Sequence, residues 1–290
     1  RHAWSREAVP AEQIWQPGPD NRMISWPYTK LLNSNNMVDQ GAVVILTSVE
    51  KATYLQIPPE RWVFPWSGTD AHDTYAVAER WEYHRSPAIR IGAQRALELA
   101  GLDAGDVDLI DIYSCFPSAV QVAANEIGVP IDDPARPLTV TGGLTFAGGP
   151  WNNYVMHSIA TMAEQLAAAP GTRGLITANG GYLTKHAFGV YSATPPPGGF
   201  RWADVQDLVD REPTRAEDAD FAGVGTLESW TASFDRDGRP DKAFLAVRTP
   251  AEARALAVIT DPDGAAALIE SADPAGAKVR VQPDGSAELI

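Results

Sequence analysis

The feature that most constrains the fold is a regular alternation of helix and strand signals between residues 86 and 193. Ser86 and Pro87 open an amphipathic stretch that stops at Gly101, the pattern of a helix with a serine N-cap, a proline in its first turn and a glycine after its end. The rest of this region reads as the strand DVDLIDIYS, the helix FPSAVQVAANEIG, a helix with apolar residues every three or four positions after residue 150, and the strands RGLITANGG and HAFGVYSA. Alternating strands and helices predict an α/β layered unit with a largely buried mixed sheet.

A break follows at TPPPGGF, residues 194–200, where proline and glycine exclude continued regular structure. Beyond it the chain shows short strand candidates separated by turns, namely VGTLESWTASF, KAFLAVRT, ARALAVIT and AKVRVQ, with one short helix around DGAAALIES. This pattern predicts a small antiparallel, barrel-like β domain. We therefore expect two domains, residues 1–200 and residues 201–290.

The first eighty residues are rich in Trp and Pro and are weakly periodic, which is typical of a long loop region that lies against a larger body. Within it, GAVVILTS at residues 41–48 is a continuous apolar run with many β-branched residues. Such a run predicts a strand that is buried on both faces.

Composition excludes several classes of protein. The net charge of −14 repels a phosphate backbone, so we expect no nucleic-acid partner. No stretch of eighteen apolar residues occurs, so we expect a soluble protein without a membrane span. Cys115 is the single cysteine, which excludes an internal disulfide and a Cys-rich zinc site and favours the reducing cytoplasm. The five histidines show no ligand spacing, so we expect no metal.

Four segments of the chain resemble, in order, the C-terminal half of the thiolase superfamily. They are NSNNMVDQGAVVILTSVEKA, SPAIRIGAQRALELAGLDAGDVDLIDIYSCFPSAVQVAANEIGV, TVTGGLTFAGGP and GLITANGGYLTKHAFGVYS. The β-rich tail is similar to that of thiolase-like proteins with an additional C-terminal β-barrel domain. The four segments also resemble the sterol-carrier-protein-2-type thiolases. The resemblance implies a thiolase-like layered half-fold, a coenzyme A (CoA) ester as ligand without any further cofactor, and an N-terminal thiolase half as partner, in the same or a separate polypeptide.

The resemblance also places the family's catalytic positions in this sequence. The histidine of the family's GHP loop corresponds to Gly149, and the cysteine of its CxG loop corresponds to Ala178, or to Asn179 after a slip of one residue. In YSCFP, Tyr113 replaces the family's asparagine or histidine, and Cys115 is the one candidate thiol. A glycine and an alanine supply neither a base nor an acid, so the thiolase reaction is expected to be lost.

The candidate site residues fall into two groups. Tyr113, Cys115 and His186 are the catalytic candidates, although a cysteine at a strand-to-helix corner is also a common packing residue. By the same resemblance, the residues expected to contact a CoA ester are Gly142, Gly143, Gly148, Gly180, Gly181 and Lys30.

Three functions stay open from the sequence. The first is a thiolase-like protein, related to acetyl-CoA acetyltransferases, that binds CoA esters without thiolase chemistry. The second is a retro-aldolase that cleaves a β-hydroxyacyl-CoA with Tyr113 in place of the cysteines. The third is a residual acyltransferase that uses Cys115, which would need a neighbouring base to form the thiolate. Whether the chain is an enzyme is therefore undecided by its sequence.

Overall fold

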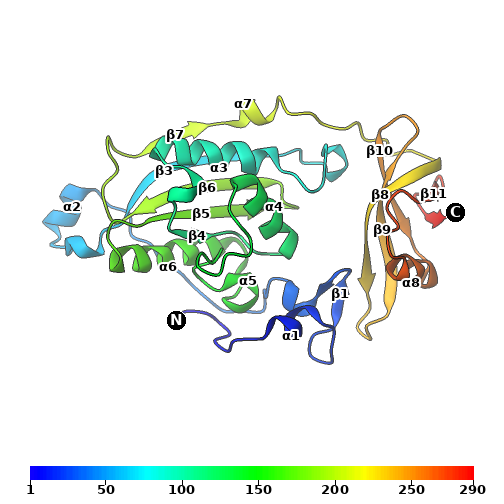
Figure 1. Ribbon diagram of the computed structural model, residues 1–290, viewed down its shortest axis with the longest axis horizontal. Coiled ribbons are helices and arrows are strands. Elements are labelled where there is room, and N and C mark those ends of the chain that lie inside the picture. Colours follow the sequence, from blue (N-terminus) through cyan, green and yellow to red (C-terminus); the bar gives the residue numbers. More distant parts are fainter. The chain divides into compact units, whose positions relative to one another are not determined.

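Strand pairing in the computed structural model, which describes residues 1–290, produces two separate sheets (Figure 1). Each sheet belongs to one of two compact units. The first unit comprises Arg1–Glu7, Asn33–Asp73 and Glu82–Glu212, and the second comprises Ala8–Leu32, Thr74–Trp81 and Pro213–Ile290.

The first unit contains a five-stranded mixed sheet with the order β4-β5-β6-β3-β7. Its strands are β3 (Phe64–His72), β4 (Leu109–Asp111), β5 (Arg173–Gly180), β6 (Lys185–Ser192) and β7 (Arg201–Asp204). β4 is parallel to β5 and β3 is parallel to β7, whereas β6 is antiparallel to both of its neighbours. The predicted α/β unit with a mixed sheet is confirmed.

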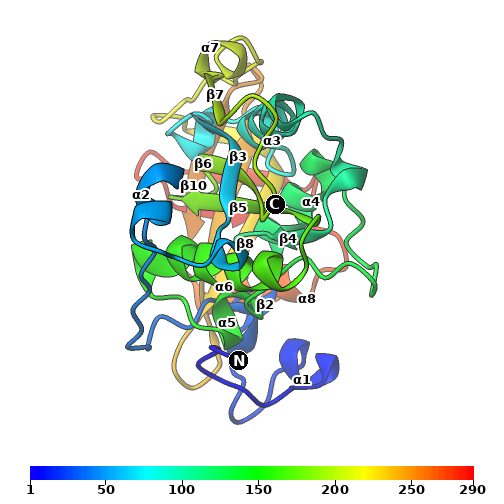
Figure 2. The ribbon, with the colours of Figure 1, turned by 90° about the vertical axis from the view of Figure 1, so that its left-hand side faces the viewer.

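Helices cover both faces of this sheet. The unit contains α2 (Val49–Tyr54), α3 (Pro87–Ala100), α4 (Pro117–Ile127), α5 (Gly143–Phe146), α6 (Tyr154–Ala168) and α7 (Gln206–Val209), together with the single 3₁₀ turns η2 (Pro59–Arg61), η4 (Ala104–Asp106) and η5 (Trp151–Asn153). Leu175 packs in the core with α3 and α4, and its neighbour Ile176 packs against α6, because successive side chains of a strand point to opposite faces. Figures 1 and 2 accordingly show α3 and α6 on opposite sides of the sheet.

The helix ends follow the sequence signals. The Ser86 hydroxyl accepts the backbone N–H of Ile89 at the start of α3, and Gly101 ends this helix in the left-handed conformation. Gly128 ends α4 in the same way, with φ of 83°. The predicted helices and strands of residues 86–193 are therefore confirmed.

The apolar run at residues 41–48 corrects one expectation. The sequence predicts a buried strand there, but the segment forms no strand, and Val43, Ile45 and Leu46 are 82%, 82% and 85% exposed. The core strand of this part of the chain is instead β3, which begins sixteen residues later within the predicted loop region. An apolar β-branched run shows that a segment is suited to a strand. It does not show that a neighbouring strand is available to pair with that segment.

The second unit is built on an antiparallel sheet of seven strands. They are β1 (Met23–Ser25), β2 (Tyr28–Thr29), β8 (Gly223–Phe234), β9 (Pro240–Arg248), β10 (Arg254–Ile259), β11 (Lys278–Val281) and β12 (Ala287–Leu289), and the unit also contains α1 (Ala11–Trp15), η1 (Lys30–Leu32), η3 (Val77–Glu79) and α8 (Pro262–Glu270). The long strand β8 pairs with β9, β11 and β1. The predicted antiparallel β-rich region and the helix predicted around DGAAALIES, which is α8, are confirmed, whereas the short helix α7 was not predicted.

The strand pairings of the second unit do not close a barrel. The main path ends at β10 on one side and at β2 on the other, and one isolated bridge, between Val258 and Ser286, links β10 to the segment before β12. The sequence predicts a barrel, but the strand pairings form an open sheet. The regular spacing of short strands predicts an antiparallel sheet, and it does not determine whether the two edge strands of that sheet pair with each other.

An arginine is fully buried in this second unit. Arg254 lies on β10, and its guanidinium donates to both carboxylate oxygens of Glu228, from Nε at 2.7 Å and Nη2 at 2.8 Å. It also donates to the carbonyl oxygens of Ala78, Arg80 and Trp81. The short segment Thr74–Trp81 is thereby fixed to the sheet by charge-assisted hydrogen bonds.

Candidate functional site

An open cleft of about 290 Å³ lies in the first unit where β4, β5 and β6 meet the start of α6. Its lining consists of Tyr113, Trp151, Asn152, Val155, Ala178, Asn179, Gly180, Lys185, His186 and Ala187. The structure thus brings together four of the residues selected from the sequence, namely Tyr113, Ala178, Gly180 and His186. The lining contains Lys185 and His186 but no carboxylate, although the chain carries a net charge of −14.

Tyr113 lies two residues after the end of β4. Its backbone N–H donates to the Thr177 hydroxyl of β5 at 3.0 Å, and its ring meets the ring of Tyr154 edge to face, with centroids 5.2 Å apart. Burial raises the pKa of Tyr113, and the nearby Cys115 raises it further. The phenol is therefore neutral near pH 7, where it can donate a hydrogen bond but is a poor base.

Cys115 is joined to the cleft through Asn179. The amide Nδ2 of Asn179 donates to the Cys115 sulfur at 3.4 Å, and the Oδ1 atom of Asn179 is buried without a hydrogen-bond partner. Burial raises the pKa of the Cys115 thiol, and the contact with Asn179 offsets only part of that effect. The thiol is therefore protonated at neutral pH and a weak nucleophile.

His186 lies on β6 with 2% of its side chain exposed. The sheet places it between Asn179 of β5 and Ala71 of β3. Its Nε2 atom is 3.8 Å from Oδ2 of Asp73, the residue that follows β3. Asp73 is 113 positions away in sequence, so only the pairing of β3 with β6 reveals it as a neighbour of His186.

The glycine loop is packed against the polar segment at residues 33–40. The backbone N–H of Gly149 donates to the Asn35 carbonyl at 2.9 Å, and Ser34 N–H donates to the Cys115 carbonyl at 3.1 Å. A Cβ atom at position 149 would overlap Ser34 Oγ, and one at Gly148 would overlap the Gln40 amide. Both glycines therefore leave room for this segment.

The first turn of the loop is fixed by a buried carboxylate, Asp111. Tyr154 donates its hydroxyl to Asp111 Oδ1 at 3.0 Å, and Thr139 donates its hydroxyl to Oδ2 at 3.0 Å. Thr139 Oγ1 in turn accepts the backbone N–H groups of Gly142 and Gly143, both at 3.1 Å. Burial raises the pKa of Asp111, and it raises that of Tyr154 well above its ordinary value. The two glycine amides are therefore hydrogen-bonded within the loop.

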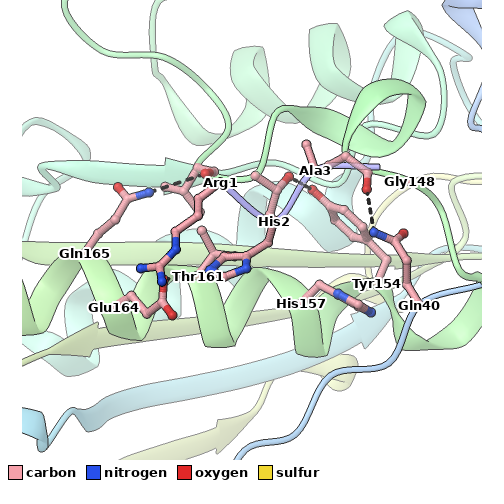
Figure 3. A pocket seen from close by; sticks show the side chains of 13 residues that line it. Arg1, His2, Ala3, Gln40, Gly148, Tyr154, His157, Thr161, Glu164 and Gln165 are labelled. Atoms are coloured by element: carbon pink, nitrogen blue, oxygen red, sulfur yellow. Dashed lines mark hydrogen bonds and ion pairs between the residues drawn. The ribbon is translucent and has the colours of Figure 1, made fainter. Parts of the chain in front are cut away.

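A second cavity, of about 200 Å³, lies beside α6 under the first residues of the chain (Figure 3). His2 Nε2 lies 3.1 Å from Glu164 Oε2, and the Gln40 amide donates to the Ala147 carbonyl at 3.0 Å. Figure 3 shows these residues around the cavity. Gly148 is the one residue selected from the sequence that lines it. Because Tyr154 lines this cavity and its ring contacts Tyr113, the two tyrosines separate the cavity from the cleft.

Gly181 and Lys30, which were also selected from the sequence, are not among the residues that line the cleft beside Tyr113. Gly181 is in the turn between β5 and β6, with φ of 68°, and Lys30 is exposed at η1 in the second unit. Conversely, sequence reasoning missed Trp151, which is 71% exposed at the cleft and has φ of 52°. The sequence did offer one signal for Trp151, because it directly follows Gly149 and Pro150. A Gly-Pro pair favours a turn, and the side chain after a turn is often exposed.

No group of three or more His, Cys, Asp or Glu side chains is arranged to hold a metal ion. None of the helices combines the length and the apolar character needed to cross a bilayer.

The layered mixed sheet with helices on both faces is similar to the fold of thiolase-like proteins. Residues 204–286 match the family described as the additional C-terminal domain of thiolase-like protein type 1. The structure is similar over 100% of its length to a monomeric SCP2-thiolase-like protein type 1 from Mycobacterium smegmatis, with a TM-score of 0.85 and 32% sequence identity. The resemblance to the thiolase superfamily inferred from the sequence is thus confirmed.

A curated relative is more distant. An acetyl-CoA acetyltransferase from Methanothermobacter thermautotrophicus is 26% identical over 179 residues, which are 57% of this chain. The chain spans 45% of that enzyme and 63% of the M. smegmatis protein.

Proposed function

We propose that this chain is the part of a thiolase-like protein that binds a CoA ester without performing thiolase chemistry. The observation that carries this proposal is the lining of the cleft, in which Lys185 supplies a cation, Tyr113 supplies a hydroxyl and no carboxylate is present. In a strongly acidic protein, such a cleft is a local exception that favours a ligand with electron-rich oxygens. A thioester and its phosphates are ligands of this kind.

Three features argue against the thiolase reaction. Gly149 and Ala178 have no acid or base, and Ser34 occupies the space that a side chain at position 149 would need. The raised pKa of Cys115 leaves it as a thiol, so acyl transfer through this residue is also disfavoured.

We further propose that a companion part, in the same or another polypeptide, covers the exposed run at residues 41–48. Four consecutive apolar residues there, Val43 to Leu46, are between 36% and 85% exposed, and they have the composition of a strand. We retain residues 1–200 as a thiolase-like half and residues 201–290 as the additional domain in this proposal.

A retro-aldolase is the second candidate, because Tyr113 lines the cleft beside His186. A neutral tyrosine can hydrogen-bond a substrate hydroxyl or carbonyl, and a nearby base would then remove the proton. This function requires Tyr113 for turnover, whereas simple binding requires it only for affinity.

The experiment is a titration of the full chain with acetoacetyl-CoA by calorimetry, followed by assays for thiolysis and for cleavage of 3-hydroxyacyl-CoA. We expect binding and no thiolysis. Tyr113→Phe should change affinity by a few fold only, and the matched control is Tyr182→Phe, since Tyr182 is 81% exposed and outside the cleft lining. Thiolysis at about 10 per second would refute the proposal. Cleavage of a 3-hydroxyacyl-CoA that Tyr113→Phe abolishes would establish the retro-aldolase instead.

A further inference from the structure

The cleft where β5 and β6 meet the start of α6 has a floor of small residues. Ile176 and Tyr191 pack with α6, and because the side chains of a strand alternate between faces, Ala178 and Ala187 lie on this same face of the sheet. These two alanines are paired directly across β5 and β6. Each supplies one methyl group, and Gly180, two residues further along β5, supplies no side chain. The floor of the cleft is therefore low and apolar.

Two aromatic rings line the same cleft. They belong to Trp151 and Tyr113. The ring of Tyr113 is held by its edge-to-face contact with Tyr154, whose centroid is 5.2 Å away. Val155, in the first turn of α6, and the amide of Asn152 complete this side of the lining. A group that lies on the floor is therefore surrounded mainly by apolar and aromatic side chains.

Trp151 has an uncommon backbone conformation for a large residue. Its φ of 52° lies in the left-handed region, which a bulky side chain rarely adopts. The turn is fixed by two hydrogen bonds, from Trp151 N–H to the Gly149 carbonyl at 2.7 Å and from Asn153 N–H to the Pro150 carbonyl at 3.1 Å. The indole is nevertheless 71% exposed, so this strained position contributes little burial to folding. Strain of this kind is concentrated at ligand-binding sites.

Lys185 gives the cleft its positive charge. It lies two residues from Ala187 on β6 and therefore on the same face of the sheet, whereas the intervening His186 side chain lies on the opposite face with Phe188. A Cβ atom at Gly180 would be 3.4 Å from Cε of Lys185, so the lysine stem passes over this glycine at the end of the floor. No carboxylate lines the cleft. The apolar floor thus has a cation at one end.

The size of the cleft fits one ring with a polar group attached. Its volume is about 290 Å³, whereas an apolar cavity of about 150 Å³ is enough to bind benzene. An aromatic ring that touches other aromatic rings gains more than its buried area alone provides. A saturated group of the same size gains only the burial.

We propose that Trp151 is a specificity-determining residue that selects a ligand with an aromatic acyl group. The ring of the ligand lies over Ala178 and Ala187 beside the indole, and the carbonyl of its thioester points toward Lys185. The thioester part of this inference rests on the proposed function, whereas the site for the ring does not depend on CoA.

Calorimetry of the full chain with benzoyl-CoA and cyclohexanecarbonyl-CoA tests the selection, because the two acyl groups are similar in size but only the first is flat and aromatic. The wild type should bind benzoyl-CoA about two- to tenfold more tightly. Trp151→Leu should abolish this preference, and Trp151→Phe, which keeps a ring, should retain it. The matched control is Trp202→Leu, since Trp202 is 59% exposed on β7 and outside the cleft lining. Equal affinities in the wild type, or a preference that persists in Trp151→Leu, would overturn the inference.

Binding of free benzoate tests the ring site without CoA. In the chain labelled with ¹³C at its alanine methyl groups, benzoate should shift the NMR signals of Ala178 and Ala187, assigned by replacing each with serine, and Trp151→Leu should reduce these shifts. If benzoate leaves both signals in place, the ring site is refuted. If neither CoA ester binds while benzoate shifts both signals, the proposed function fails and the ring site stands.

Discussion

Replacing Gly149 by alanine should lower the free energy of unfolding by about 1–2 kcal/mol. The new Cβ would overlap Ser34 Oγ and would lie 3.2 Å from Asn36 Oδ1 and 3.4 Å from Ser34 Cβ. Overpacking of this kind costs about 1–3 kcal/mol. Alanine also restricts the unfolded chain, which offsets about 0.4–1 kcal/mol. Since the φ of Gly149 is not positive, no backbone strain adds to the cost.

The local structure offers little escape from this overlap. Ser34 could rotate its hydroxyl away, but it would lose the hydrogen bond that it donates to Asn36 at 2.8 Å. The segment cannot simply withdraw, because Ser34 N–H and the Asn35 carbonyl are hydrogen-bonded to Cys115 and Gly149 on either side. The cost should therefore depend on Ser34.

A double-mutant cycle measures that dependence. Ser34→Ala removes the overlapping oxygen, so in its presence Gly149→Ala should be nearly neutral, with a coupling energy of at least about 1 kcal/mol in urea unfolding followed by tryptophan fluorescence. Gly105→Ala is the matched control, since a Cβ there meets nothing within 4 Å. The reasoning fails if Gly149→Ala behaves like Gly105→Ala, or if Ser34→Ala gives no relief.

Three other predictions test separate features of the chain. Burial raises the pKa of Cys115 above its ordinary value of 9.0. Its alkylation by iodoacetamide should therefore be slower than that of a free thiol, and the alkylation rate should reach half its maximum above pH 9.0. Rapid alkylation at pH 7, measured by mass spectrometry, would contradict this. Glu228→Gln should cost the second unit about 3–5 kcal/mol in urea unfolding, because Arg254 is left buried without its carboxylate. Burial tends to raise the pKa of Glu228, but Arg254 outweighs this effect, so the pKa in the folded protein lies below 4.5. The wild type should therefore lose this stabilisation as the pH falls through the folded pKa of Glu228. If the stability of Glu228→Gln depended on acid pH in the same way, the proposed pair would be contradicted. Ile45→Lys should leave the melting temperature unchanged and reduce light scattering by the isolated chain, since Ile45 is 82% exposed, whereas a large drop in melting temperature would mean that the side chain is buried.

The elements of the first unit were predictable where local signals and tertiary packing agree. The N-cap at Ser86 and the left-handed glycines at positions 101 and 128 determine where two helices begin and end, and these signals lie within a few residues of the ends they set. β3 gave no such signal, because its sequence contains Pro65, Gly68 and four polar residues and alternates weakly. Its place in the sheet depends on pairing with β6, more than a hundred residues away.

The candidate site shows the same limit. The resemblance to thiolases selected Tyr113, Ala178 and His186, which the fold brings to one cleft. It could not select Ser34, because this residue acts through a contact with a residue distant in sequence. The predicted division into residues 1–200 and 201–290 stays a prediction about domains, while the compact units alternate along the chain.

That alternation has a practical consequence for anyone who wishes to isolate the additional domain. The chain passes between the two units five times, so no single proteolytic cut releases either of them whole. A fragment limited to the family match at residues 204–286 would carry β8 without β1, leaving part of its edge open to pairing with other copies, and it would leave Arg254 without the carbonyls of Ala78, Arg80 and Trp81. Chimaeras between relatives would therefore have to exchange Ala8–Leu32 and Thr74–Trp81 together with the tail to transfer the second unit whole.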